Sequence, residues 1–315
     1  MSTPTENTNP ESMDFDFLLN DRIQKIQQIA KEYDLEKNAY LSFSGGKDSC
    51  VLTALIDMAL PSNKIPRVYI NTGMEYLLQV RFVKECAEQD PRIQIIAPTK
   101  NVRETLERVG YPFKSKFHAR QVHVIQKTGM TESTKKYFYP KANTPHSCPK
   151  ILQYQATEKL DFPVSDYCCT EFKKKPIAEY ETRSGRKVGI VGIRRGEKGT
   201  RENAQCLVFT GDSLHRFQPL APCDEDFCNE FVKRFDIKLS PLYYEPYNFK
   251  RTGCKGCPFN VHLADDLRTL LEHFPSEFRA CRSLWRPVYN EYERIGYRIK
   301  RGQFMIQNEL FEDNK

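Results

Sequence analysis

A glycine-rich loop between a predicted strand and a predicted helix constrains the fold of this chain more than any other feature. The loop reads Ser42-Phe43-Ser44-Gly45-Gly46-Lys47-Asp48-Ser49. The apolar segment 39–43 before it is typical of a short buried strand, and in 47–60 apolar residues recur at helical spacing. Paired glycines let the backbone approach an anion closely, and N–H groups at a helix start attract phosphate. The loop therefore predicts a phosphate site.

The side chains of the loop support that interpretation and exclude two common phosphate loops. Ser42, Ser44 and Ser49 supply hydroxyl donors, and Lys47 supplies a mobile positive charge. A Walker A loop needs Ser or Thr after Gly-Lys, but Asp48 stands there, and Leu41 stands where its first glycine belongs. The Gly-x-Gly-x-x-Gly dinucleotide pattern is also missing.

Strands alternate with helices along most of the chain. Strands are predicted at 39–43, 67–70, 92–96 and 187–193, and helices at 15–33, 47–60, 75–89, after Val102, 149–160, 224–235 and within 264–297. Asp224 is expected to cap the helix that follows it. This order predicts an α/β fold, a parallel twisted sheet with helices on both faces.

The pattern also suggests domain boundaries. We expect a disordered tail at 1–14, a main domain at 15–262 and a helical C-terminal extension at 263–315. The helix and strand signals weaken at about 110–166, which is rich in Lys, His, Tyr and Pro. We interpret that stretch as an insertion in the main domain.

Composition narrows the cellular setting. The chain has 315 residues, a net charge of +7 and 11 cysteines. It contains no apolar run long enough to predict a membrane span, and its polar first residues lack the apolar core of a secretion signal. Many cysteines without such a signal predict reduced thiols and a cytoplasmic location without membrane attachment.

Four cysteines form a candidate metal site. Cys168 and Cys169 are adjacent, and Cys254 and Cys257 form a Cys-x-x-Cys some eighty residues later. Four thiolates suit zinc or an iron–sulfur cluster. Structural zinc usually uses two Cys-x-x-Cys pairs, whereas adjacent cysteines suit a cubane cluster better. Free structural thiols are the remaining alternative.

The motifs resemble those of a known superfamily. Ser-Gly-Gly-Lys-Asp-Ser resembles the PP-loop of the adenine nucleotide α-hydrolases, which bind ATP or a sulfated adenosine nucleotide. This resemblance implies that the loop binds an adenine nucleotide. It also implies that Asn71, Thr72 and Gly73, after the second strand, lie at the adenosine pocket.

The cysteine pattern resembles the 4Fe–4S signature of adenylyl-sulfate reductases, within the phosphoadenosine phosphosulfate (PAPS) reductase family. The likeness covers roughly residues 39–260 without the insertion. It implies a 4Fe–4S cluster on the four cysteines. It also implies that the segment 192–201 is an arginine-rich loop that binds the anionic end of the nucleotide, through the side chains Arg194, Arg195 and Arg201.

Two reactions remain open within this resemblance. Assimilatory reductases carry a nucleophilic cysteine near the C-terminus in a Glu-Cys-Gly-x-His segment, which is missing here, so Cys148 and Cys281 would be the replacements. The complete PP-loop is more typical of members that cleave ATP at the α phosphate for sulfur transfer to tRNA or DNA. We therefore rank ATP pyrophosphatase first, with Lys47 and the three arginines stabilising phosphate charge and Mg²⁺ bridging the phosphates.

A function of another class is also consistent with the sequence. The stretch 114–141 interleaves Lys, Arg and His with Tyr and Phe, and Arg294, Arg298, Lys300 and Arg301 follow near the end. Such patches bind phosphate backbones. The chain would then be a nucleotide- or redox-sensing nucleic-acid-binding module. For the enzyme that we rank first, the expected partners are an adenine nucleotide, a sulfur-donor protein and a DNA or tRNA acceptor.

Overall fold

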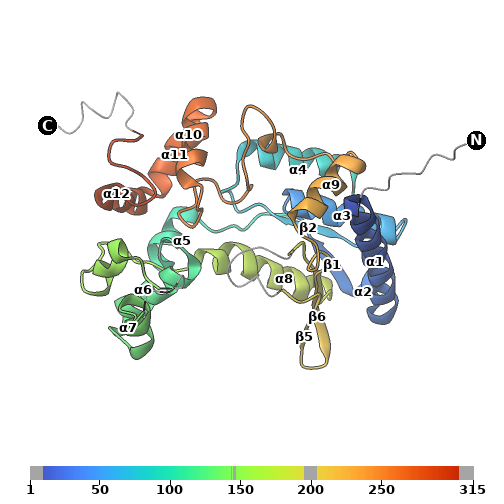
Figure 1. The fold of residues 1–315 in the computed structure, drawn as a ribbon, viewed down its shortest axis with the longest axis horizontal. Helices are drawn as coiled ribbons and strands as arrows, with labels where there is room; N and C mark the ends of the chain where they lie inside the picture. Colours follow the sequence, from blue (N-terminus) through green and yellow to red (C-terminus); the bar gives the residue numbers. More distant parts are fainter. Residues whose placement is uncertain (1–9, 143, 145–146, 195–203, 305–315) are drawn as a thin grey trace, which may run out of the picture. The chain divides into compact units, whose positions relative to one another are not determined.

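The computed structural model describes residues 10–142, 144, 147–194 and 204–304, with side chains from Phe15 onward. The chain folds into two compact units (Figure 1). Unit 1 comprises Met1–Asn71, Leu77–Ala97 and Ile177–Glu245. Unit 2 comprises Thr72–Tyr76, Pro98–Pro176 and Pro246–Lys315. Each unit thus combines segments that are far apart in the sequence.

Unit 1 contains a six-stranded sheet in the order β3-β2-β1-β4-β6-β5. Its strands are β1 Ala39–Ser42, β2 Arg67–Ile70, β3 Ile93–Ile96, β4 Val188–Ile190, β5 Leu207–Thr210 and β6 Ser213–Phe217. All neighbours pair in parallel except β5, which runs antiparallel to β6. The predicted α/β fold class is confirmed, because the sheet is mostly parallel and helices cover it. The edge hairpin β5–β6 was not predicted.

Side chains alternate across the central strand β1 and bury both of its faces. Ala39 and Leu41 belong to the large core, which also holds apolar side chains of α1 Pro10–Tyr33, α3 Lys47–Ala59 and α9 Glu225–Arg234. Tyr40 points to the other face, where it packs with Val68 and with Tyr180 of α8 Lys175–Ser184. Figure 1 shows these helices around the strands. Because helices cover both faces of the sheet, a ligand can reach only the ends of its strands.

The remaining elements of unit 1 are α2 Leu35–Asn38, α4 Leu77–Gln89 and the short 3₁₀ turn η3 Pro241–Tyr243. Of these, α4 agrees with the predicted helix 75–89, and the other two were not predicted. The predicted cap is confirmed, since the Asp224 carboxylate accepts a hydrogen bond of 2.9 Å from the Phe227 N–H at the start of α9. Helix α1 begins at Pro10, five residues before the predicted start at Phe15.

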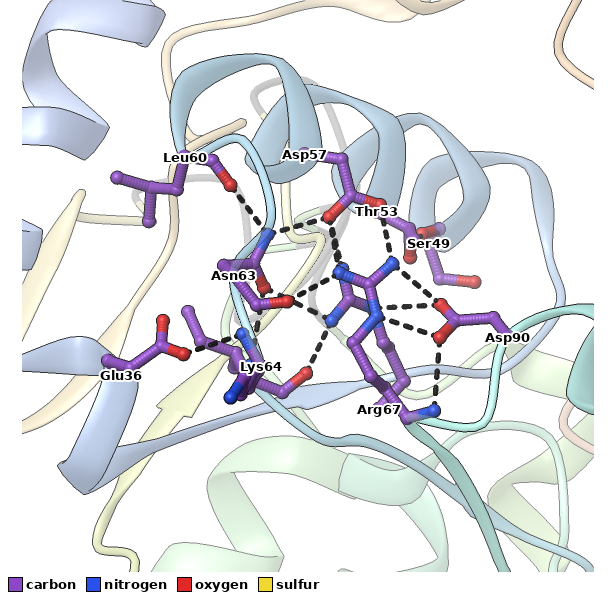
Figure 2. Close-up of polar contacts among 11 residues, drawn as sticks. Glu36, Ser49, Thr53, Asp57, Leu60, Asn63, Lys64, Arg67 and Asp90 are labelled. Carbon is purple, nitrogen blue, oxygen red and sulfur yellow. Dashed lines mark hydrogen bonds and ion pairs between the residues drawn. The ribbon is translucent and has the colours of Figure 1, made fainter.

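A buried ion network joins α3 to the first residues of β2 and β3 (Figure 2). The fully buried Arg67 guanidinium pairs with Asp57 of α3 and lies 3.5 Å from the Asp90 carboxylate. Arg92 also contacts both carboxylates, at 3.0 Å from Asp57 and 2.7 Å from Asp90. Two positive and two negative side chains therefore balance one another at the amino ends of the strands.

Unit 2 is helical in most of its described residues. Its helices are α5 Val102–Val109, α6 Lys116–Thr128, α7 Glu132–Phe138, α10 Leu263–His273, α11 Pro275–Leu284 and α12 Arg286–Ile295, together with the 3₁₀ helix η1 Lys150–Ala156 and the π-helical turn η2 Thr170–Lys174. Helices α6 and α7 lie in the insertion at about 110–166, where the sequence analysis assigned only the helix 149–160.

Two predicted helices of unit 2 differ from the structure. The predicted helix 149–160 is the shorter 3₁₀ helix η1, which ends where the Thr157 hydroxyl donates to the Tyr154 carbonyl at 3.1 Å and competes with helical bonding. The helical stretch 264–297 is divided into α10, α11 and α12. Pro275 starts α11 and has no N–H with which to continue α10. In the ranges described, no helix is long and apolar enough to cross a membrane.

Candidate functional site

The predicted phosphate loop lies in unit 1, between β1 and α3 at the carboxyl end of the strand. Gly45 has a φ of 68°, in the left-handed region that favours glycine. A Cβ atom at this position would overlap the Gln79 side chain and lie 2.6 Å from the Val83 Cγ2 atom. Gln79 also donates from Nε2 to the Ser44 carbonyl at 3.0 Å. Helix α4 therefore shapes the loop and requires glycine there.

Hydroxyl groups organise the loop from within. The Ser44 and Ser49 oxygens lie 3.1 Å apart, and the Ser49 hydroxyl donates to the Gly46 carbonyl at 2.8 Å. The Gly46 N–H donates to the Ser44 oxygen at 3.3 Å, and the Ser44 N–H to the Ser49 oxygen at 3.2 Å. The two serines thus fix the curvature of the loop at the start of α3, and phosphate binding there stays a prediction.

Two side chains of α9 hold the loop lysine, and sequence reasoning did not find them. The Lys47 ammonium donates to the Glu225 carboxylate at 3.0 Å and to the Asn229 side-chain oxygen at 2.7 Å. The hydrogen bond from Lys47 is the largest cause that holds the pKa of Glu225 below its ordinary value. Both side chains lie about 180 residues beyond Lys47, so no local pattern could have revealed them.

Arg194 contacts two carboxylates beside the loop. The Arg194 Nε donates to the Asp48 carboxylate at 3.1 Å, and its terminal nitrogen lies 3.5 Å from the Glu225 carboxylate. The Tyr243 hydroxyl accepts the Lys47 backbone N–H at 3.1 Å. The loop therefore presents Lys47 and Arg194 side by side, two cations that can contact phosphate oxygens. Arg195 and Arg201 lie outside the described residues.

The Asn71-Thr72-Gly73 segment has a structural role that the sequence did not suggest. The Asn71 N–H donates to Ile96, the last residue of β3, at 2.8 Å. Thr72 begins a stretch of unit 2, where its N–H and its hydroxyl donate to the Glu75 carboxylate at 2.9 and 2.8 Å. Thr72 therefore stabilises the turn that leads to Glu75, and its predicted place at an adenosine pocket stays a prediction.

That turn holds the Cys-x-x-Cys in unit 2. Glu75 forms an isolated antiparallel bridge with Cys254, and the Lys255 N–H donates to the Met74 carbonyl at 2.6 Å. The Cys257 N–H donates to the Cys254 carbonyl at 3.2 Å, which closes the turn between the two thiols. Gly256 has a φ of 59°, and a Cβ there would lie 2.9 Å from the Cys281 sulfur.

The adjacent cysteines lie where the π-helical turn η2 begins. Cys168 is buried, and its pKa is raised first by its hydrogen bond with Cys169, then by burial and by the nearby thiols Cys257 and Cys254. The same bond is the largest cause that lowers the pKa of Cys169. The four predicted cysteines of unit 2 therefore gather close enough to influence one another.

A lysine accompanies these thiols. Lys173 of η2 is half-buried, and the nearby Cys254 is the largest cause that raises its pKa. An ammonium group beside thiolates offsets their charge, so the donor set of four thiols with Lys173 fits a thiolate-bound cluster chemically. In the described part of the chain, however, no group of three or more His, Cys, Asp or Glu side chains is placed to hold a metal ion.

The two cysteines considered as replacement nucleophiles are enclosed. Burial raises the pKa of the Cys148 thiol to about 11, and the residue is 3% exposed. Cys281 is 1% exposed, and burial raises its pKa to about 12. Thiols of this kind are weak nucleophiles because little thiolate forms near neutral pH.

The fold and the loop together define a PP-loop nucleotide-binding protein of the α/β class. The chain belongs to the PAPS reductase family, since the model of the phosphoadenosine phosphosulfate reductase domain matches residues 38–260. That range includes the loop, Arg194 and all four cysteines. The predicted family is thereby confirmed.

Curated relatives match this chain over different lengths. An uncharacterized protein of Methanocaldococcus jannaschii is 32% identical over 293 residues, which are 88% of this chain and 55% of that protein. The adenosine 5'-phosphosulfate reductases of Rhodococcus erythropolis and Rhodococcus opacus are 30% and 29% identical over 103 residues, 32% of this chain and 40% of each enzyme. The chain thus spans about half the length of the curated relatives it matches.

Two solved structures illustrate the range of more distant likenesses. The PAPS reductase of Candida auris has a TM-score of 0.43 and 13% identity, covering 81% of this chain and 97% of that enzyme. The U34-tRNA thiolase of Methanococcus maripaludis with its 4Fe–4S cluster has a TM-score of 0.37 and 15% identity, covering 91% and 81%. Both scores are below 0.5, so neither likeness bears on function.

Proposed function

We propose that this protein cleaves ATP between the α and β phosphates and uses the resulting adenylate to activate an acceptor for sulfur transfer. The phosphate loop is the observation that supports this most. It combines serine hydroxyls, helix-start N–H groups and the ammonium of Lys47 at one strand end. Its complete Ser-Gly-Gly-Lys-Asp-Ser sequence is the form that resembles ATP-using members of the superfamily.

The proposed reaction forms and breaks bonds in two steps. An acceptor oxygen attacks the α phosphorus, the bond to the β-phosphate oxygen breaks, and pyrophosphate leaves. A sulfide ion, supplied by a sulfur donor, then attacks the carbon that bears the activated oxygen, a carbon–sulfur bond forms, and AMP leaves with that oxygen. Lys47 and Arg194 would stabilise the charge that grows on the pyrophosphate. Arg195 and Arg201 are candidates for the same role.

Magnesium would assist the first step. Mg²⁺ prefers oxygen ligands, and the Asp48 carboxylate supplies one within the loop that would hold the phosphates. Asp48 would have to exchange its contact with Arg194 for the metal. Arg194 would then be released toward the phosphates.

The four cysteines would hold a 4Fe–4S cluster in unit 2. Such a cluster supplies sulfur or electron chemistry when it is bound. The residues of this chain do the positioning: Glu75 and Met74 fix the Cys254–Cys257 turn, and the Lys173 ammonium offsets thiolate charge. Zinc on the same thiols is the alternative occupant.

Product identity tests the reaction. Anaerobically purified protein is incubated with labelled ATP or labelled PAPS, with RNA and DNA acceptors present, and the products are separated by chromatography. We expect AMP and pyrophosphate from ATP and little sulfite from PAPS. Sulfite from PAPS, with no pyrophosphate from ATP, would establish a sulfonucleotide reductase instead. Salt-sensitive binding of RNA or DNA without turnover of either nucleotide would support the sensing module.

The reductase is the second candidate because two curated relatives are named adenosine 5'-phosphosulfate reductases. It needs a thiol that can attack a sulfonucleotide. Burial of Cys148 and Cys281 disfavours both of them in that role, which is why we rank this reaction below ATP cleavage.

Iron analysis tests the cluster separately. We expect about four irons per chain and matching acid-labile sulfide after anaerobic purification. Cys254→Ser and Cys257→Ser should each abolish the iron content, because each removes one thiolate. Cys86→Ser in unit 1 is the matched control and should retain it. One zinc per chain without labile sulfide would exclude the cluster.

A further inference from the structure

Most of the net positive charge of the chain lies in one stretch of unit 2. Residues 110–166 contain nine Lys and Arg against four Asp and Glu, a net +5 of the +7 carried by the 315 residues. The rest of the chain is therefore almost neutral. Such segregation favours an extended anionic partner over a small nucleotide, which needs only the few charges of one loop.

In this stretch and directly after it, exposed aromatic rings lie among the charges. Phe117 in the first turn of α6 is 53% exposed, and Tyr167 is 46% exposed. Lys116 is exposed beside Phe117, and the Arg120 side chain, one turn further along α6, is 61% exposed. We call Lys116, Phe117, Arg120 and Tyr167 the aromatic–basic patch. Exposed rings beside basic side chains offer a ligand both a stacking face and positive charge.

The two aromatic residues of the patch are held in place. Arg120 pairs with Asp166 at 2.7 Å, which ties α6 to the segment that carries Tyr167. The Tyr167 ring meets the His123 ring edge-on, with centroids 5.0 Å apart. The Phe117 ring meets the buried Tyr137 ring in the same manner at 5.1 Å. Rings fixed in this way lose little conformational freedom when a ligand stacks on them.

The patch adjoins the cysteine pair. Tyr167 immediately precedes Cys168, and its carbonyl accepts hydrogen bonds of 2.9 Å from the Thr170 and Glu171 N–H groups at the start of η2. A ligand on the patch would therefore reach the candidate cluster site.

We propose that the aromatic–basic patch binds an unpaired nucleobase and the phosphates beside it, so that the sulfur acceptor of this enzyme is a base in a single-stranded or looped nucleic acid. The inference rests on the proposed function for its chemistry. Phe117 and Tyr167 provide faces for base stacking, and Lys116 and Arg120 contact the backbone. A duplex hides the faces of its bases, so this surface discriminates against it.

Nucleic-acid affinity tests the proposal on the full-length protein. Fluorescence anisotropy is measured with a labelled single-stranded RNA, a DNA of the same sequence and the corresponding duplexes. We expect tighter binding of a single strand than of its duplex. The strand with the higher affinity, RNA or DNA, identifies the kind of nucleic acid that the patch binds. Phe117→Ala and Tyr167→Ala should each weaken binding about 5- to 100-fold, and Phe117→Trp should restore it.

Lys116→Ala tests the phosphate contact through its salt dependence. Losing one contact should reduce the slope of log affinity against log salt by about 0.7. The matched controls are Phe209→Ala, where Phe209 is 45% exposed in unit 1, and Lys37→Ala, an exposed lysine of α2. Both should bind like wild type. Thermal midpoints show whether each variant is folded, and Phe117→Leu replaces Phe117→Ala if the latter unfolds.

Two results would overturn the proposal: no binding of either single strand, or equal affinity of wild type, Phe117→Ala and Tyr167→Ala. Pyrophosphate release by the wild type is measured in parallel. If ATP is cleaved while no strand binds, the inference fails and the proposed function stands. If strands bind on the patch while no pyrophosphate forms, the proposed reaction fails and the surface assignment stands.

Discussion

Lys47 illustrates how a loop residue depends on distant side chains. Its ammonium is held by Glu225 and Asn229 of α9, and Glu225 is 61% exposed. An ion pair with so exposed a partner contributes little to folding stability. Under the proposed function, these contacts orient the lysine for a phosphate. We therefore expect the loss of Lys47 to change nucleotide binding more than folding stability.

We predict that Lys47→Ala raises the dissociation constant for ATP about 10- to 100-fold, the loss of one charge-assisted hydrogen bond. Isothermal titration calorimetry at fixed magnesium measures it. Lys64→Ala is the matched control, because Lys64 is an exposed lysine just before β2, at the opposite end of the strand. Equal ATP affinity in Lys47→Ala and wild type would refute the assignment of the loop.

The two glycines of the loop differ in what they require. Gly45 has a left-handed φ and no room for a Cβ atom, whereas Gly46 has φ −76° and ψ 160°, an extended conformation that any residue adopts. We predict that Gly45→Ala lowers the free energy of unfolding by about 1–3 kcal/mol, through backbone strain and overlap with Gln79.

Gly46→Ala is the natural comparison for Gly45→Ala. It should change the unfolding free energy by less than about 1 kcal/mol. Urea denaturation of both variants, followed by circular dichroism, measures the difference. Equal destabilisation by the two substitutions would show that the left-handed φ angle is not what requires glycine at position 45.

At the scale of elements, the ion network in Figure 2 fixes how α3 lies against β2 and β3. Burial alone would raise the pKa of Asp90, but the hydrogen bonds and charge of Arg92 outweigh it and hold the pKa below its ordinary value. The stability that this pairing adds is present above the unfolded pKa of about 4 and is lost as pH falls through the lower folded value.

We predict that Asp57→Asn destabilises the protein by about 2 kcal/mol at pH 7. The fully buried Arg67 would then share one carboxylate, that of Asp90, with Arg92. Equilibrium denaturation with urea measures the change. Glu88→Gln on the exposed face of α4 is the control and should stay within about 0.5 kcal/mol of wild type. Equal effects of the two substitutions would contradict a structural role for the network.

At the scale of the whole molecule, unit 2 carries a carboxyl group with the opposite pH response. Asp266 of α10 is 6% exposed, and burial raises its pKa to about 7, although the Tyr76 hydroxyl and the Asn260 amide donate to it. Its neighbour Asp265 raises the pKa slightly further. The folded state therefore binds an extra proton between about pH 4, the unfolded pKa, and pH 7.

We predict that unit 2 loses stability as pH rises from about 4 to 7 and that Asp266→Asn removes this loss. Fluorescence can follow it, because the single tryptophan, Trp285, is buried in unit 2 and donates to the Lys255 carbonyl at 3.0 Å. Asp265→Asn, an exposed neighbour, should keep the wild-type pH profile. A flat profile in the wild type would contradict the raised pKa.

Much of this protein can be predicted from local sequence. The loop, the strand β2, the helix α3 and the Asp224 cap follow from glycines, apolar spacing and capping residues that act within a few positions. The PP-loop family followed from short motifs for the same reason. The edge hairpin β5–β6 was missed because its strands carry little apolar alternation.

Only the tertiary structure decided which distant residues share a site. Lys47 meets Glu225 and Asn229, and Glu75 meets Cys254, across some 180 residues in each case. It also brought Cys254 to Lys173 and placed Tyr167 against α6. Such contacts depend on how whole elements pack, and packing is set by side chains on both partners, so no window of the sequence contains the information. Local sequence determined the loop and its family; the packing of the elements determined the partners of each functional side chain.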